Sequence, residues 1–189
     1  MTEKPLQPIR VFHLLPGGGA HELPALPDAP PAQGFYWIAC TRAAFGPGLA
    51  RLQATLQTLT GQQLVDLHVS DLLNAQLPSR YDYTAQYDLL VLRRLAQAQA
   101  GAAAPLPGPT ARGGPPVLRR IDTSPVGFAV FDQVLLSVHP EDCSVRDAYA
   151  ARLAAATPPA PSETAARDPR SGAVASARSP ASSADLMLR

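Results

Sequence analysis

The densest group of potential metal ligands and nucleophiles in the sequence is the segment 139–143, His-Pro-Glu-Asp-Cys. A structural zinc site needs four such ligands, usually supplied as two spaced pairs. The chain offers no second pair, because it contains neither a Cys-x-x-Cys nor a His-x-x-x-His motif. We therefore interpret this segment as the end of a strand followed by the start of a helix.

Cysteine chemistry is a second possibility. Cys143 can be combined with His13, His68 or His139 as a nucleophile and its base, but nothing in the sequence near Cys143 or Cys40 marks an activated thiol. Two cysteines also cannot build a disulfide framework. Both are expected to be buried structural residues. A small cytosolic hydrolase stays an alternative, and it requires a pocket that contains a cysteine or histidine with a perturbed pKa.

Gly17-Gly18-Gly19 follows a predicted strand, which is the position of a phosphate-binding loop. The pattern lacks the Gly-Lys-Ser/Thr ending, and the chain runs into Pro24 where a phosphate loop would begin a helix. These glycines are therefore predicted to form a turn.

Composition limits the classes of partner. The chain has 189 residues, the length of one domain. It carries 16 lysines and arginines against 15 acidic residues, a net charge of +1. Nucleic-acid binding needs a concentrated basic surface, so the balance argues against a nucleic-acid partner and against a polybasic membrane patch. No stretch approaches the ~20 apolar residues of a membrane-spanning helix, and the first residues do not resemble a signal peptide. We expect the chain as given to be soluble and cytoplasmic.

The elements that must position these residues follow from periodicity. Three tracts rich in Ala, Pro, Gly or Ser are predicted to be loops or disordered, namely 16–33, 97–116 and 157–189. Leu49, Leu52, Leu56 and Leu59 recur at helical spacing and should be buried on one face of a helix over 47–60, which starts near Pro47 and stops at Gly61. Short apolar runs predict strands at 11–15, 35–40, 64–67, 87–95, 126–131 and 134–139, the last two as a hairpin. A one- to two-turn helix capped by Ser70 or Asp71 is expected to end near Asn74, and a last helix over 144–156.

This order predicts an α/β fold with one mixed sheet of about five to seven strands flanked by helices, and not a doubly wound nucleotide fold. We place the domain at 1–156 and a linker at 157–189.

The most distinctive stretch is 66–94. Asp71-Leu72-Leu73-Asn74 is followed by Pro78, Arg80, Tyr81-Asp82-Tyr83 and an aliphatic strand that ends in Arg93-Arg94. This order resembles the cytoplasmic domain of the CorA family of divalent-cation transporters, including its zinc-transporting branch. The hairpin 126–139, the helix start at 145–153, the Trp-Ile strand at 35–38 and the helix 47–60 also stand where that family has them. The resemblance covers roughly residues 10–155.

The sequence departs from the family pattern in several places. The His-Pro-Leu segment is shortened to His68-Val69-Ser70, and an acidic pair is reduced to Asp71 alone. The Gly-Met-Asn signature, the long stalk helix and the two membrane helices of the family are absent from the chain, and residues 185–189 are similar to the region just before the stalk. We therefore expect a fragment of a longer protein rather than an independent soluble relative.

The resemblance implies a regulatory domain of a homopentamer, in which Mg2+ bound between neighbouring subunits holds a pore closed. It implies that Asp71 is a metal ligand and that the full-length protein lies in the bacterial inner membrane with this domain on the cytoplasmic side. Neither sequence nor resemblance selects among Mg2+, Co2+, Ni2+ and Zn2+ or names the remaining ligands. The residues alone favour a simpler role for Asp71, as a helix cap.

The fragment alone is expected to transport nothing and not to be an enzyme. As a single carboxylate, taken to be exposed on a short helix, Asp71 would bind Mg2+ only in the millimolar range, in a monomer or weak oligomer. The alternative is a stand-alone soluble binding or adaptor module with the same fold.

Overall fold

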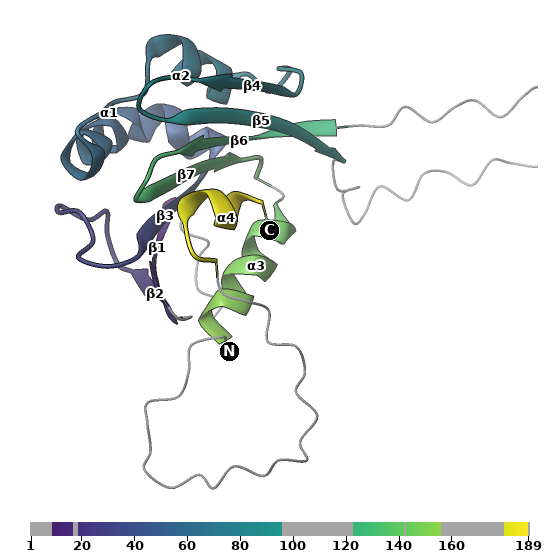
Figure 1. Cartoon of the computed structure of the whole chain (residues 1–189). Helices are drawn as coiled ribbons and strands as arrows, with labels where there is room; N and C mark the ends of the chain where they lie inside the picture. The colour runs from purple at the N-terminus through teal and green to yellow at the C-terminus, as the bar shows by residue number, and fades with distance from the viewer. Residues whose placement is uncertain (1–8, 17–18, 96–122, 142, 156–179, 189) are drawn as a thin grey trace, which may run out of the picture.

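The computed structural model describes residues 9–16, 19–95, 123–141, 143–155 and 180–188. In them one seven-stranded sheet carries helices on both faces (Figure 1). In chain order the elements are β1 (Ile9–Leu15), β2 (Gly19–Leu23), β3 (Phe35–Thr41), α1 (Arg42–Thr60), α2 (Asp66–Leu73), β4 (Arg80–Tyr83), β5 (Asp88–Leu95), β6 (Thr123–Val130), β7 (Val134–His139), α3 (Ser144–Ala155) and α4 (Ser183–Met187).

The strands lie in the order β2-β1-β3-β7-β6-β5-β4. The central pair, β3 and β7, is parallel with Ile38 opposite Leu136, and the other described pairs are antiparallel. The predicted hairpin over 126–139 is formed by β6 and β7. The mixed sheet flanked by helices is confirmed.

The central strand β3 explains why both faces are covered. Tyr36, Ile38 and Cys40 pack in the core beneath α1 and α2, whereas Phe35, Trp37 and Ala39 pack in the core beneath α3 and α4. Successive side chains of a strand point to opposite faces, so a strand without polar positions must be buried on both. Each of its seven residues is buried.

Helix α1 begins at Arg42, earlier in the chain than the predicted start near Pro47. Thr41 accepts a hydrogen bond from the backbone N–H of Ala44 (3.3 Å) and caps the first turn, so Pro47 lies inside the helix rather than at its start. The helix ends as expected at Gly61, which has a left-handed φ of 72°. Three of the four predicted leucines are buried (Leu52, Leu56 and Leu59), and Leu49 is partly buried against the same core.

Two short strands escaped prediction, and one predicted strand does not form. β2 lies inside the tract 16–33 and pairs with β1, where Arg10 contacts Glu22 at 2.8 Å. β4 adds an edge strand next to β5. The strand predicted over 64–67 is wrong, because α2 begins at Asp66.

The C-terminal residues also differ from the prediction of a linker over 157–189. Residues 183–187 form α4, and Leu186 is buried in the same core as Trp37 and Leu135. The described residues 180–188 are thus packed on the domain. The predicted tracts 97–116 and 157–179 lie outside the described residues. Among the described residues, the helices are all too short or too polar to cross a membrane.

Candidate functional site

Asp71 lies in the last turn of α2 and is buried, with 8% of its surface exposed. The prediction that it caps the helix is wrong, since the residue before the first turn is Val65. The expectation that it is an exposed carboxylate is also wrong. Its position follows from α2 beginning at Asp66, which places Asp71 and His68, three residues apart, on the buried side of the helix.

The buried carboxylate meets a cation from β4. Arg80 Nη1 lies 3.0 Å from Asp71 Oδ2, and Arg80 Nη2 donates to Asp82 Oδ2 at 2.9 Å. Among the described residues Asp71 Oδ2 receives no well-aligned hydrogen bond, so its contact with Arg80 is mainly electrostatic. One arginine therefore bridges two carboxylates, and the three charges sum to −1.

A chain of hydrogen bonds extends this group to Tyr87, the residue before β5. The Val65 backbone N–H donates to the Tyr87 hydroxyl (3.0 Å), which lies 2.8 Å from His68 Nδ1. His68 Nε2 is 3.4 Å from Asp82 Oδ2. Every group is satisfied if Tyr87 donates to Nδ1 and His68 carries its proton on Nε2. The hydrogen bond with His68, followed by that from the Tyr83 backbone, lowers the pKa of Asp82.

Helix α2 packs closely against the sheet through Leu72. A Cβ at Gly127 of β6 would overlap Leu72 Cδ2, so a larger residue there would require the Leu72 side chain to shift. Arg42 of α1 donates from Nε to the Leu72 carbonyl (3.2 Å) and from Nη2 to the Pro125 carbonyl (2.6 Å). These contacts fix the end of α2 and with it the position of Asp71.

A divalent cation that binds Asp71 would find no preformed set of ligands among the described residues. No group of three or more His, Cys, Asp or Glu side chains suited to a metal ion occurs among the described residues. A cation that binds Asp71 must compete with the guanidinium of Arg80, which contacts the same oxygen.

Of the other predicted reactive residues, His139 and Cys143 lie near each other, away from Asp71, whereas Cys40 is buried in the core beneath α1 and α2. His139 ends β7 and Cys143 precedes α3, as the strand-to-helix interpretation of 139–143 requires, and Cys143 Sγ lies 3.4 Å from His139 Nδ1. His13 instead contacts the Gln33 carbonyl at 2.9 Å. Cys40 and Cys143 are both buried and free.

The Cys143–His139 pair does not provide a nucleophile and its base. Burial, aided by nearby arginines, lowers the pKa of His139 to about 3. Such an imidazole cannot hold a proton taken from a thiol at neutral pH. Burial also raises the pKa of Cys40 to about 12, which keeps it a thiol. The hydrolase alternative gains no support from these groups.

The glycine segment does not lead into a helix. Gly19 begins β2 and pairs with Leu15, so the segment connects two antiparallel strands, and Gly17 and Gly18 lie outside the described residues. The helix that a phosphate loop needs at this point is replaced by a strand.

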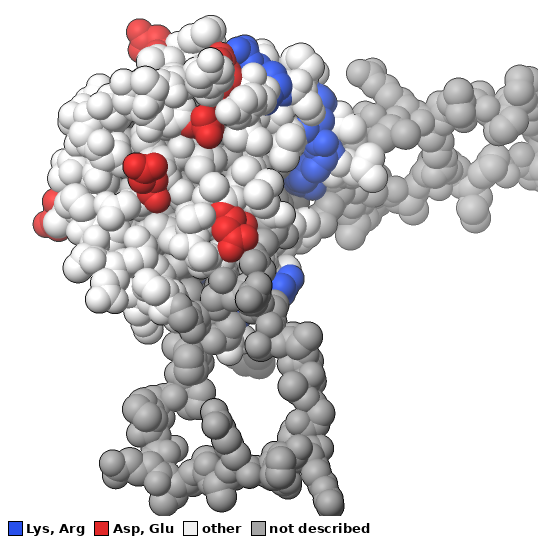
Figure 2. Space-filling view, viewed as in Figure 1, with Lys and Arg blue, Asp and Glu red and all other residues white. Residues whose placement is uncertain are grey.

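The sequence interpretation missed Arg80, Asp82 and Tyr87 as partners of the Asp71 region. In a strand over 80–83, alternate side chains point the same way, which places Arg80 and Asp82 on one face. The sequence interpretation did not predict this strand, and so it did not pair the two residues. Figure 2 shows acidic and basic side chains side by side near α2 and β4, and further basic side chains continue from there along one edge of this face.

Replacing Asp71 with asparagine is expected to lower the free energy of unfolding by about 1–2 kcal/mol. This value lies between those for exposed and buried ion pairs, because Asp71 is 9% and Arg80 34% exposed. The exposed Asp66→Asn on the same helix should cost a few tenths of a kcal/mol. Urea unfolding of both variants measures the difference, and equal losses would contradict a structural role for the Asp71–Arg80 contact.

Comparison with known proteins places the fold. No protein-family model matches the sequence. No curated protein matches it either. Among solved structures, the full-length CmaX protein matches 98% of this chain and 45% of its own, with a TM-score of 0.56 and 16% identity. The CorA magnesium transporter from Methanocaldococcus jannaschii matches 82% of this chain and 38% of its own (TM-score 0.52, 10% identity).

A third match is the cytoplasmic domain of ZntB from Vibrio parahaemolyticus, over 79% of this chain and 50% of that one (TM-score 0.50, 14% identity). The chain thus spans half or less of the solved chains that it matches. At these identities the likeness shows a shared fold. The fold that the sequence resemblance implied is confirmed.

Proposed function

We propose that this chain, which has the fold found in CorA and in the cytoplasmic domain of ZntB, is the cytoplasmic regulatory domain of a divalent-cation transporter. The observation that carries the proposal is the fold itself. Two of the similar structures are the CorA magnesium transporter and the ZntB cytoplasmic domain, and CmaX matches nearly the whole chain. On this proposal the chain senses intracellular Mg2+ and gates a pore supplied by another part of a homopentamer in the bacterial inner membrane.

Asp71 is the metal ligand we propose within this domain. Its carboxylate is held in place by α2, and only Arg80 contacts its Oδ2 as a counter-charge among the described residues. Mg2+ keeps most of its waters and often uses one or two carboxylates, so a single aspartate suits a weak site completed by a neighbouring subunit. Competition from Arg80 adds a reason for millimolar affinity in the isolated chain.

The experiment is titration calorimetry of Mg2+ into the chain and two variants. Asp71→Asn should abolish the weak binding, whereas Arg80→Gln should tighten it by up to about fivefold, because the competing cation is removed. Asp66→Asn is the matched control and should bind like the unaltered chain. Co2+, Ni2+ and Zn2+ in parallel show which metal is preferred.

Two results of this titration would contradict the proposed metal site. Unchanged Mg2+ binding in Asp71→Asn would rule out Asp71 as the ligand. Micromolar binding that is lost in Asp71→Asn would mean a complete site inside one domain instead of a site shared between subunits.

The alternative is a stand-alone soluble binding or adaptor module, and the apolar cavity beneath α3 and α4 favours it. The gene sequence downstream of the codon for Arg189 distinguishes these two proposals. A reading frame that continues past Arg189 into two hydrophobic spans with Gly-Met-Asn supports the transporter, whereas a stop codon after Arg189 supports the module.

A further inference from the structure

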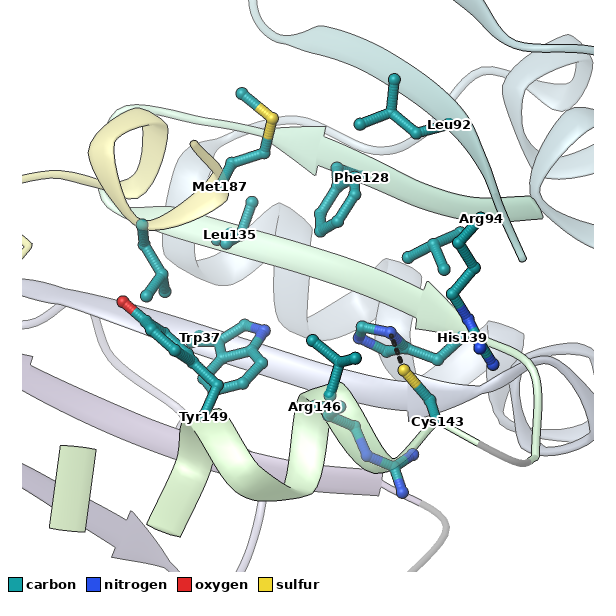
Figure 3. A pocket seen from close by; sticks show the side chains of 13 residues that line it. Trp37, Leu92, Arg94, Phe128, Leu135, His139, Cys143, Arg146, Tyr149 and Met187 are labelled. Atoms are coloured by element: carbon teal, nitrogen blue, oxygen red, sulfur yellow. Dashed lines mark hydrogen bonds between the residues drawn. The ribbon is translucent and has the colours of Figure 1, made fainter. Parts of the chain in front are cut away.

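The four histidines of the chain divide into a buried pair and a surface pair. His68 and His139 are buried, with 2% and 5% exposed, and His139 faces Cys143, as the dashed line in Figure 3 marks. His13 on β1 is partly exposed, and His21 on β2 is exposed. Of the four imidazoles, the surface pair is therefore the one that a ligand can reach from solvent.

His13 and His21 are directly opposite each other in the antiparallel pair of β1 and β2. Residues in this relation project from the same face of a sheet, with Cβ atoms about 4.5–5.5 Å apart. Arg10 and Glu22, which contact each other at 2.8 Å, are at odd spacing from the two histidines and so lie on the other face. The strand register thus places two imidazoles side by side and keeps the guanidinium of Arg10 away from them.

His13 is held in a form that can bind a metal ion. Its Nε2 lies 2.9 Å from the carbonyl oxygen of Gln33. A carbonyl oxygen can only accept, so the proton of the neutral ring is on Nε2, and Nδ1 keeps its lone pair. Histidines that bind metals usually donate their second N–H to a carbonyl or a carboxylate in this way. The ring also packs against Tyr36, with 5.0 Å between centroids, which restrains its orientation.

His21 is the adjustable member of the pair. Its ring extends along β2 toward Gly19, where a Cβ would lie 4.0 Å from His21 Nε2. Exposed side chains change rotamer within picoseconds to nanoseconds, so the ring can turn toward His13 when a metal ion offers a bond. One imidazole is therefore fixed by its neighbours, and the second can move to complete the pair.

We propose that His13 and His21 together bind a transition-metal ion of the Zn2+ type, with water in its remaining positions. Imidazole nitrogen suits Zn2+, Cu2+ and Ni2+, whereas Mg2+ prefers oxygen ligands. The site lies on β2 and β1, at the edge of the sheet opposite β4, where Arg80 contacts Asp71 (Figure 1). It is therefore separate from the proposed Mg2+ ligand and does not depend on the proposed function.

NMR of the four imidazole rings tests the site residue by residue. Before metal is added, His13 should show the tautomer with its proton on Nε2. Zn2+ should then shift the ring signals of His13 and His21 with saturation and leave those of His68 and His139 in place, and an excess of Mg2+ should not reverse the shift. The proposal is overturned if Zn2+ produces no saturable shift at His13 and His21, or if Mg2+ displaces it.

Matched variants test the strand register, with the Zn2+ affinity measured from the His13 ring signal. His21→Gln should weaken binding by about tenfold or more, because loss of even an outer partner of a metal ligand costs about 10–100-fold. The double variant His21→Gln, Glu22→His keeps four histidines but puts the second one on the other face of β2. It should bind Zn2+ as weakly as His21→Gln alone.

Equal Zn2+ affinity in the unaltered chain and in His21→Gln would show that His21 is not a ligand, and full recovery in the double variant would show that the register does not matter. His21 is exposed, so its replacement leaves the core intact. Magnesium calorimetry of His21→Gln should match the unaltered chain, and a changed Mg2+ affinity would contradict the separation of the two sites. Zn2+ should shift the His13 signal equally in Asp71→Asn, so that failure of one proposal does not decide the other.

Discussion

Replacing Gly34 with alanine is expected to lower the free energy of unfolding by about 3 kcal/mol. Gly34 precedes β3 with a φ of 75°, and a Cβ at this position would overlap the carbonyl oxygen of Leu14 in β1. The left-handed conformation costs an L-residue about 1–2 kcal/mol, and forcing extra atoms into packed structure costs about 1–3 kcal/mol. The overlapping atom is backbone in the β1–β3 ladder, so it cannot move aside as a side chain would.

Gly61→Ala is the matched control. Gly61 has nearly the same φ, 72°, but no atom lies within 4 Å of a Cβ placed there. Its replacement should therefore cost only the conformational part, about 1 kcal/mol. Urea unfolding followed by far-ultraviolet circular dichroism gives both values. Equal losses in the two variants would mean that the approach of Gly34 to Leu14 contributes nothing.

The second large effect is a loss of stability on mild acidification, carried by His139. Burial, reinforced by the charges of Arg146, Arg94 and Arg42, lowers its pKa to about 3 in the folded chain. In the unfolded chain its pKa is about 6.5. Between these values the unfolded state binds one more proton, so the free energy of unfolding falls as the pH falls, by about 1.4 kcal/mol per pH unit. This contribution is fully present above pH 6.5, and about 2 kcal/mol of it is lost by pH 5.

Comparison with His139→Gln isolates this contribution. The variant should lose most of the pH dependence between pH 7 and pH 5, whatever its stability at pH 7, whereas His21→Gln, altered at an exposed residue of β2, should retain it. The measurement is the urea midpoint of each protein across this range. A pH dependence in His139→Gln as steep as in the unaltered chain would show that His139 is protonated in the fold as readily as in the unfolded chain.

The sheet and its main helix were predictable because their signals are local. The run Phe35–Cys40 has no polar position and must be buried on both faces, and the leucines of 47–60 repeat at the helical period. The hairpin 126–139 was recognised from two apolar runs around Asp132 and Gln133. These patterns depend only on residues that are close in the sequence. The tertiary contacts of these segments favour the same strands and helix that the patterns predict.

The error at 64–67 shows where local preference fails. Leu64 and Val65 suit a strand, but the Leu64 backbone exchanges two hydrogen bonds with the Gln53 side chain, and the Val65 N–H donates to the Tyr87 hydroxyl. These partners lie 11 and 22 residues away and hold the segment as a loop, so that α2 begins at Asp66. The burial of Asp71 follows from this shift, and no short-range pattern indicates it.

The sequence by itself thus determined the fold class, the central strands, the hairpin and the α1 core face, because hydrophobic periodicity carries that information within each segment. The resemblance over 66–94, and not the periodicity, singled out Asp71. Only the tertiary structure decided that Asp71 is buried against Arg80, because the pair forms when an edge strand docks beside α2. The cavity likewise exists only in three dimensions: Trp37, Arg94, His139 and Leu186 come from four distant segments, and their proximity depends on strand order and on the docking of α3 and α4.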